Sequence, residues 1–416
     1  MSANGRRRVA VTGIGVVTPV AIGAEPFWEG LLEGRSGITP IDVFDASSHP
    51  VRIAGQVRDF EPRDWVDVKD AKRLDRFCHL AVAAAVMAVE DARFAPRRPD
   101  RVGTIFGSGV GGVKVAGDNI IAEHERGPRR VVPFFIPGSI PNMATCQVSM
   151  RLGFSGPSTC TVTACASSAD AVGWGFRLVR DGYADACMVG GTEAPVHPAV
   201  IAGFANMRAL STRNHDPGGA SRPFEADRDG FVLSEGAGAL LLESLDGARE
   251  RGASVYAELC GFGQAGDAYH ETAPDPAAGG PARAIASALE DAGLEPADVG
   301  YVNAHATSTR MADEVETKAM HRVFGERARE LPISSTKSMT GHMLGAAGAV
   351  ESAVCALALR HGWLPPTINY ARPDAACDLD YVPNEPRRAA PRAVLSNSMG
   401  FGGHNACLAF RALAPS

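Results

Sequence analysis

Residues 158–176 read Ser158-Thr-Cys-Thr-Val-Thr-Ala-Cys165-Ala-Ser-Ser-Ala-Asp-Ala-Val-Gly-Trp-Gly-Phe176, and the pattern changes in the middle of this stretch. The β-branched residues 161–163 predict a short buried strand, and the Ala-rich spacing from Ala164 onward predicts a helix. Cys165 falls at the turn between them, where unpaired backbone N–H groups and the helix dipole favour a thiolate. The alternative is a buried structural cysteine, and the rest of the chain decides between the two.

The composition indicates a globular protein and argues against several functions. The 416 residues can bury the core of one large domain or of two fused halves. A net charge of −6 argues against binding to nucleic acid. The apolar run after Arg6–Arg8 imitates a signal peptide but contains Gly13, Gly15 and Pro19, and no stretch is long enough to span a membrane. Nine scattered cysteines without a C-x-x-C pair fit reduced thiols, so we expect a cytoplasmic location.

The order of predicted elements occurs twice along the chain. A helix over 79–92 ends Ala88-Val-Glu-Asp-Ala92, and a helix over 282–292 ends Ala288-Leu-Glu-Asp-Ala292. A strand follows each helix, over 101–106 and 299–303. The opening strand 8–12, with a turn at 13–15, is echoed by 255–263.

This repetition predicts two copies of one α/β unit, residues 1–252 and 253–416. Strands alternating with helices imply sheets covered by helices, so the expected layers are helix, sheet, helix, sheet and helix.

In two such halves, the loops that follow equivalent strands meet at one place. His305 follows the strand that ends at Asn303, and His342 lies in a strand-to-helix turn like that of Cys165. A Gly-rich loop over 397–405 follows a strand over 393–396. Its Gly400, Gly402 and Gly403 permit unusual backbone angles and close approach to a ligand.

One cysteine and two histidines can form either a thiolate–imidazole nucleophile or a metal site. The second half has no close ligand pair of the H-x₃-H kind, and carboxylates do not cluster beside the histidines. The sequence therefore favours nucleophilic chemistry and predicts no metal site.

Four separated motifs resemble those of the β-ketoacyl-ACP synthases of the thiolase-like superfamily. They are Thr163-Ala-Cys165-Ala-Ser-Ser, Asn303-Ala-His305-Ala-Thr-Ser-Thr309, Lys337-Ser-Met-Thr-Gly-His342 and Gly400-Phe-Gly-Gly-His-Asn. The resemblance runs from about Val9 to Phe410 and is nearest to the elongating synthases II and their type II polyketide relatives. It implies a thiolase-like five-layer αβαβα fold.

The resemblance also implies a mechanism. Cys165 would take an acyl chain from an acyl carrier protein as a thioester, malonyl-carrier would lose CO₂, and the carbanion would attack the thioester. His305 and His342 would stabilise the enolate, while the backbone N–H groups of Cys165 and Phe401 would form an oxyanion hole. Lys337 would pair with Glu351. The phosphopantetheine arm carries the substrates, so no other cofactor is expected.

Further residues match substrate contacts of the family. Thr307 and Thr309 match positions that hydrogen-bond the pantetheine arm, and Phe401 matches a gating phenylalanine. Three residues match the acyl tunnel, the last of them across a dimer interface: Val110, Phe204 and Phe135. Together with Gly402 they form the expected substrate site.

The chain departs from the family pattern around the expected malonyl entrance. Ala306 and Ala312 replace glycines, Arg310 replaces a proline, and Met399 replaces a phenylalanine that is frequent there. None of these changes removes a catalytic group, so we expect them to affect the choice of substrate.

The expected partners are an acyl carrier protein and a second ketosynthase subunit, either an identical copy or a chain-length-factor homologue. Carrier proteins of the family are acidic, and basic positions match its docking face: Lys69, Lys72, Arg73, Arg129, Arg130 and Arg208. A solvated charged helix face is the alternative for residues 69–76.

Four other functions are alternatives to a fatty acid or polyketide synthase of the elongating type. Chain-length factors lack the cysteine that is present here. Thiolases have a Cys/His/Cys set of catalytic residues, and Cys407, which lies beyond the Gly-rich loop, does not match the position of their second cysteine. A scaffold subunit of an active synthase, and a ketosynthase subunit of a secondary-metabolite pathway with a chain-length-factor partner, remain as alternatives.

Overall fold

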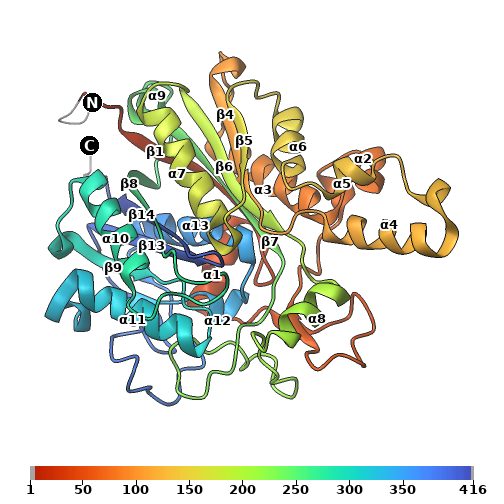
Figure 1. The fold of residues 1–416 in the computed structure, drawn as a ribbon. Coiled ribbons are helices and arrows are strands. Elements are labelled where there is room, and N and C mark those ends of the chain that lie inside the picture. The colour runs from red at the N-terminus through yellow and green to blue at the C-terminus, as the bar shows by residue number, and fades with distance from the viewer. Residues whose placement is uncertain (1–4, 414–416) are drawn as a thin grey trace.

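The computed structural model describes residues 5–413, and a ten-stranded sheet runs through it (Figure 1). In spatial order its strands are β10 (Ile333–Ser334), β9 (Val299–Asn303), β13 (Ala393–Gly400), β14 (His404–Arg411), β8 (Ala257–Gly266), β1 (Val9–Val17), β7 (Gly236–Ser244), β6 (Ala186–Glu193), β4 (Val102–Gly107) and β5 (Ser158–Thr161). Two small hairpin-like sheets lie apart from it: β2 (Ile38–Pro40) with β3 (Ile53–Gly55), and β11 (Trp363–Leu364) with β12 (Arg387–Arg388).

The large sheet consists of two five-stranded halves with the same topology. In each half the third, second, fourth, fifth and first strands of that half lie side by side. In each, the fifth strand runs antiparallel to its two neighbours, and the other pairs are parallel. The duplication predicted from the sequence is therefore confirmed. The halves also join edge to edge through β1 and β8, a pairing that the sequence did not indicate.

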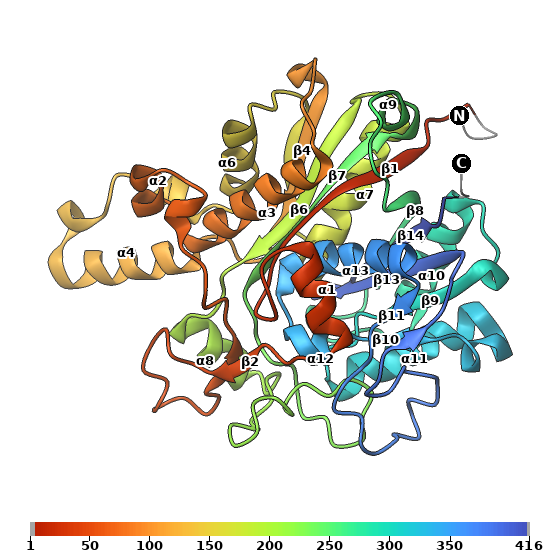
Figure 2. The same ribbon diagram turned by 180° about the vertical axis from the view of Figure 1, so that it is seen from behind.

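Helices complete the five expected layers (Figures 1 and 2). The first half is covered on its outer face by α3 (Arg76–Ala92), and the second by α10 (Gly279–Ala292) with α11 (Arg310–Phe324). Between the two halves of the sheet lie α7 (Ser167–Arg180) and α13 (Ala347–His361), which contact strands of both halves. The predicted boundary at 252/253 falls between α9 (Leu245–Glu250) and β8.

The turn predicted at residues 13–15 is wrong, because β1 continues straight through it to Val17. The two glycines serve packing instead. A Cβ on Gly13 would lie 2.1 Å from the carbonyl oxygen of Ala88, and one on Gly15 would lie 1.9 Å from that of Ala84. The second half repeats this contact, with Gly261 and Gly263 against Ala288 and Ala284 of α10 at 2.3 and 2.1 Å.

Because α3 lies so close to β1, Gly15→Ala should destabilise the protein. We expect a loss of roughly 2–3 kcal/mol in the free energy of unfolding, measured by urea denaturation, since the backbone carbonyl of Ala84 cannot move aside. Gly203→Ala is the control. Gly203 lies in α8 (Pro198–Asn206) with open space around it, and there alanine should add about 0.5–1 kcal/mol. Equal effects of the two substitutions would contradict the close contact.

An arm projects from the first half beside the edge strand β5 (Figure 1). It contains α2 (Val68–Arg73), α4 (Val113–Arg126), α5 (Phe135–Ser139) and, at its base, α6 (Met143–Leu152). The strand predicted at residues 161–163 is shifted to 158–161. It is partly exposed rather than buried, because it pairs with β4 on one side alone.

The shorter helices α1 (Ala24–Leu32) and α12 (Lys337–Thr340) complete the chain. All nine cysteines, each within the described residues, are free thiols. Within residues 5–413, no helix has the length and apolarity that crossing a membrane would require.

Candidate active site

The turn that carries Cys165 is held by side chains of the helix it opens. Residues Ala164–Ala166 form a 3₁₀ turn before α7, and Ala164 adopts a left-handed backbone with φ +50°. The Ser167 hydroxyl accepts from the N–H of Thr163 at 2.9 Å and donates to the Ala164 carbonyl at 2.6 Å. These bonds place Cys165 at the N-terminal end of α7, where it is 8% exposed.

His342 lies just before the equivalent turn of the second half. Residues Leu344–Ala346 form a 3₁₀ turn before α13, and Leu344 has φ +45°. The helices that follow the two turns approach closely because their first residues are small: a Cβ on Gly348 of α13 would lie 2.6 Å from the backbone nitrogen of Ala169 in α7. As a result, Nε2 of His342 lies 3.1 Å from Sγ of Cys165.

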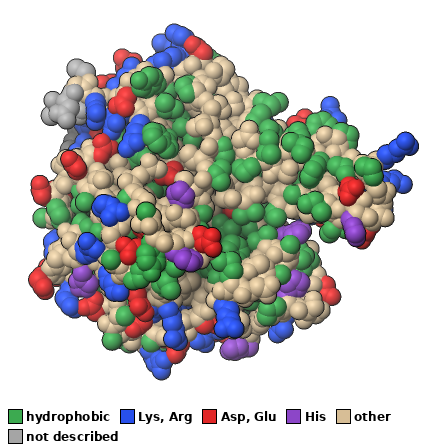
Figure 3. All heavy atoms as spheres, in the orientation of Figure 1, with side chains coloured by type: hydrophobic (Ala, Val, Ile, Leu, Met, Phe, Trp, Pro, Cys, Tyr) green, Lys and Arg blue, Asp and Glu red, His purple; other side chains and the backbone are tan. Residues whose placement is uncertain are grey.

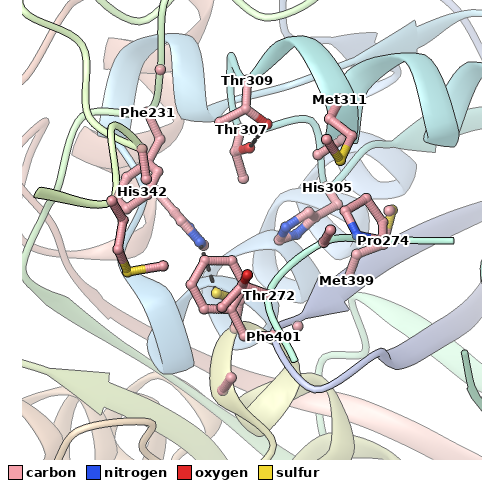
Figure 4. Close-up of a pocket in the computed structure, with 18 of the residues that line it drawn as sticks. Phe231, Thr272, Pro274, His305, Thr307, Thr309, Met311, His342, Met399 and Phe401 are labelled. Atoms are coloured by element: carbon pink, nitrogen blue, oxygen red, sulfur yellow. Dashed lines mark hydrogen bonds between the residues drawn. The ribbon is translucent and has the colours of Figure 1, made fainter. Parts of the chain in front are cut away.

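His305 faces His342 across the cavity (Figure 4). Their ring centroids are 5.4 Å apart and the rings are nearly perpendicular, at 86°. The backbone after β9 is held by Glu316 of α11, which accepts from the N–H groups of His305 and Ala306 at 2.9 and 2.7 Å. Both rings are buried, and their Nδ1 atoms have no hydrogen-bond partner among residues 5–413.

The structure brings Lys337 and Glu351 together behind the histidines. Nζ of Lys337 donates to Oε1 of Glu351, and both side chains are almost fully buried. Burial raises the pKa of Glu351, and the charge of Lys337 opposes that rise. The paired lysine therefore supplies a fixed positive charge close to the reacting groups.

Burial disfavours the charged forms of the three central groups. It lowers the pKa of His305 and of His342 well below the usual range, and the charge of Lys337 lowers both further. Burial also raises the pKa of the Cys165 thiol to about 12, against the charge of Lys337. Burial therefore opposes the thiolate that the helix N-terminus was expected to favour, and the charge of Lys337 favours it, so the thiolate stays a prediction.

Two backbone N–H groups point at the sulfur. Hydrogen bonds from the N–H of Phe401 and of Cys165 itself act to lower the pKa of the thiol. Gly400 makes this approach possible, since a Cβ there would lie 2.5 Å from the Thr163 carbonyl oxygen. The Gly-rich loop predicted over 397–405 is largely strand: β13 extends to Gly400 and β14 begins at His404, which leaves a tight turn with φ +82° at Gly402.

A cavity of about 590 Å³ opens above these groups. Thr307 and Thr309 line it, with their hydroxyl oxygens 3.0 Å apart (Figure 4). The ring of Phe231 stands edge-on to His342 at 5.3 Å, and Phe204 contacts both Phe231 and Phe401. Other expected residues that line the cavity are Val110, Arg208, Arg310, Ala312 and Met399.

The remaining predicted residues lie elsewhere. Phe135 begins α5 on the arm, and Gly402 donates its N–H to the Glu271 carbonyl at 2.7 Å. Lys69, Lys72 and Arg73 belong to α2, where the Arg73 guanidinium stacks on the Phe134 ring at 4.5 Å. Arg129 and Arg130 are exposed in the turn after α4.

Sequence reasoning missed two buried carboxylates that hold the site loops. Glu316 fixes the His305 turn, and Glu193 accepts from the N–H groups of Gly109 and Val110 at 2.8 and 3.1 Å. Burial raises the pKa of Glu193 to about 7. The sequence does contain a signal for each carboxylate. Glu193 is an acidic residue at the end of an apolar strand, and Glu316 lies in the first turns of the helix that follows the His305 turn.

Comparison with protein families finds two matches that follow one another along the chain. Residues 6–248 match the family described as beta-ketoacyl synthase, N-terminal domain. Residues 256–371 match beta-ketoacyl synthase, C-terminal domain.

The chain is similar along its whole length to named proteins. It is 50% identical over 408 residues to a 3-oxoacyl-[acyl-carrier-protein] synthase 2 of Synechocystis sp., covering 98% of each chain. It is 48% identical over 410 residues to the protein of that name from Staphylococcus aureus, covering 97% of this chain and 98% of that one.

Solved structures share the fold. One is a type II PKS acyl carrier protein in complex with its ketosynthase bound to the hexaketide, with a TM-score of 0.91 and 34% identity over 98% of this chain and 100% of that one. Another is the ishigamide ketosynthase/chain length factor, with a TM-score of 0.90 and 36% identity over 99% and 100% of the two chains.

Proposed function

The chain belongs to the β-ketoacyl synthase family, and from this premise we propose that it condenses an acyl group held on Cys165 with a malonyl group delivered by an acyl carrier protein. It is an acyltransferase of the condensing type, and the product is a β-ketoacyl-carrier of a type II fatty acid or polyketide pathway. The single observation that carries the site assignment is the 3.1 Å contact between Cys165 Sγ and His342 Nε2 on the floor of the cavity.

In the first half-reaction, Sγ of Cys165 bonds to the carbonyl carbon of the incoming acyl thioester. The bond from that carbon to the pantetheine sulfur breaks, and the thiol proton passes to the leaving sulfur. The Nε2–H of His342 stabilises the thiolate as it forms, which offsets the burial that otherwise holds the proton on sulfur. The N–H groups of Cys165 and Phe401 receive the oxyanion of the tetrahedral intermediate.

In the second half-reaction, the malonyl carboxylate leaves as CO₂ and its bonding electrons move into an enolate. Nε2–H groups of His305 and His342 donate to the enolate oxygen, a role that suits imidazoles kept neutral by burial. The α-carbon attacks the Cys165 thioester, the carbon–sulfur bond breaks, and the sulfur takes up a proton from solvent. Lys337, paired with Glu351, holds the histidine side in place.

The acyl groups reach the site on the phosphopantetheine arm, and we propose that the reaction needs no other cofactor. Thr307 and Thr309 bind the arm along the cavity wall. Val110 and Phe204 line the acyl tunnel, Phe401 with the turn at Gly402 gates it, and Phe135 reaches the tunnel of a partner subunit.

A second ketosynthase-fold subunit binds beside the projecting arm of the protein, which contains α2, α4, α5 and α6. Hydrophobic side chains gather on the arm in the space-filling view (Figure 3), and several are about half exposed: Ile120, Ile121, Val132, Phe134 and Ile136. The open edge of β5 lies beside them and can pair with another strand. This subunit is an identical copy or a chain-length-factor homologue, and the ishigamide ketosynthase/chain length factor, which is 36% identical to this chain, is an example of the second case.

Mass spectrometry of the carrier protein tests this function. The protein is incubated with malonyl-carrier and a panel of acyl-carriers, and the carrier-bound products are weighed. A carrier that gains the acyl chain extended by a keto group and one methylene supports the proposal. Malonyl-carrier and acyl-carriers recovered unchanged across the panel would overturn it.

The basic residues on the projecting arm of the protein and near the cavity are proposed to dock the acidic carrier protein: Lys69, Lys72, Arg73, Arg129, Arg130 and Arg208.

Arg129→Glu with Arg130→Glu should lower kcat/KM for carrier-bound substrates about tenfold at low salt and flatten its salt dependence. Turnover of a small pantetheine thioester should change little.

The matched control reverses two adjacent exposed arginines away from the arm. Arg97→Glu with Arg98→Glu, next to the start of β4, should leave turnover of carrier-bound substrates within about twofold of wild type. If the arm variant loses activity equally on carrier-bound and small substrates, the two arginines support the fold or the tunnel and not docking.

A further inference from the structure

The cavity has a buried floor and an exposed mouth of different character. Cys165, His305 and His342 on the floor are almost fully buried. The exposed lining residues are two methionines, two arginines and one aspartate: Met207, Met311, Arg208, Arg310 and Asp229. Asp229 lies 3.9 Å from the guanidinium of Arg213, so the two arginines of the mouth add positive charge beside apolar surface, a combination that the condensation chemistry on the floor does not use.

Arg310 stands at the mouth on a rigid backbone. It is the first residue of α11, directly after Thr309. The buried guanidinium of Arg228 donates to the carbonyl oxygens of Arg310 and Thr309 at 3.0 and 3.3 Å, and it is itself paired with Asp374 at 2.6 Å. The start of the helix, and with it the base of the Arg310 side chain, is thus fixed from below.

The guanidinium of Arg310 is left unpaired. Among residues 5–413 it makes no ion pair and no hydrogen bond, whereas its neighbour Arg228 makes several. Its charge does help to lower the pKa of Asp374, but that carboxylate is already bonded to Arg228. Arg208, across from α11 at the end of α8, likewise has no ion pair within the described residues.

We propose that Arg310, assisted by Arg208, binds the phosphodiester of the phosphopantetheine arm. This inference rests on the function proposed above. The thiol end of the arm must reach Cys165, and Thr307 and Thr309 line the cavity wall (Figure 4), with Arg310 following Thr309 directly in the chain. The group at the other end of the arm is a phosphate with one negative charge, and a guanidinium pairs with phosphate through two parallel hydrogen bonds. Arg310 is thereby a residue that selects phosphorylated substrates.

The test compares malonyl-pantetheine with malonyl-4′-phosphopantetheine, which differ in the phosphate alone, and uses CO₂ release as the readout. For the wild-type protein we expect KM to be about tenfold lower with the phosphate and kcat to be equal. Arg310→Ala and Arg310→Pro should both abolish this difference in KM while keeping kcat. Proline is compatible with the first position of a helix, so the second variant preserves the start of α11.

Three further variants sharpen the result. Arg310→Lys should retain part of the preference, because it keeps the charge and loses the paired hydrogen bonds. Lys318→Ala is the matched control, since Lys318 is an exposed cation of the same helix that lies outside the cavity lining, and it should keep the full preference. Arg208→Ala should reduce the preference without removing it.

The outcomes separate this inference from the proposed function. If the wild-type protein decarboxylates neither small thioester nor malonyl-carrier, the proposed function fails, and this inference fails with it. If it turns over both small thioesters with equal KM, the function stands and the phosphate site is wrong. A phosphate preference that survives in both Arg310→Ala and Arg310→Pro also overturns the assignment of Arg310.

Discussion

Replacing Cys165 with alanine should reduce condensation by about 10⁴-fold or more, because among the described residues that line the cavity Cys165 is the one thiol that can hold the acyl chain as a thioester. The measurement is β-ketoacyl-carrier formed from acyl-carrier and malonyl-carrier. The fold should persist: the change removes one buried sulfur atom and keeps the turn, whose hydrogen bonds come from Ser167 and Thr163. Slow release of CO₂ from malonyl-carrier should also persist, since both histidines remain.

Cys160→Ala provides the control for this result. Cys160 lies five residues earlier in β5 and is half-buried, and burial raises the pKa of its thiol to about 11. Its loss should change condensation no more than about twofold, since its sulfur faces no histidine among the described residues. If Cys165→Ala forms β-ketoacyl product at the wild-type rate, the nucleophile has been assigned wrongly.

His305→Ala and His342→Ala should each slow the decarboxylation of malonyl-carrier about 10²- to 10³-fold, the usual effect of removing a fixed donor from an oxyanion. The histidines are proposed to act on the enolate. Transfer of the acyl group to Cys165 should therefore survive at least in part, more fully in His305→Ala, because His342 alone contacts the sulfur. Release of CO₂ measures the first effect, and the intact mass of the acylated protein measures the second.

A histidine remote from the cavity separates this effect from a general loss of stability. His321 is on the outer part of α11, where Nε2 contacts Asp378 at 2.6 Å, and His321→Ala should leave both half-reactions near wild type. Should both catalytic variants fail to acylate yet decarboxylate at the wild-type rate, the two roles are reversed.

Much of the architecture could be predicted from the sequence because it depends on local patterns that occur twice. The matching ends of α3 and α10 identified the duplication, and the change from β-branched to Ala-rich residues located the turn at Cys165. The glycines of β1 were misread as a turn because glycine has two uses. It permits unusual backbone angles, and it also allows a helix to approach a strand, and the sequence alone does not show which applies.

The sequence by itself determined the α/β fold class and the duplicated halves, which follow from residue type and spacing, while its resemblance to the β-ketoacyl-ACP synthases pointed to Cys165, His305, His342 and Lys337. The tertiary structure alone decided what those residues can do. It set the 3.1 Å contact of His342 with Cys165, revealed Glu316 and Glu193 beneath the site loops, and left Arg310 unpaired at the mouth. It also surrounded Cys165 with burial, which raises the pKa of the thiol, and with the charge of Lys337, which lowers it, and no local pattern records either influence.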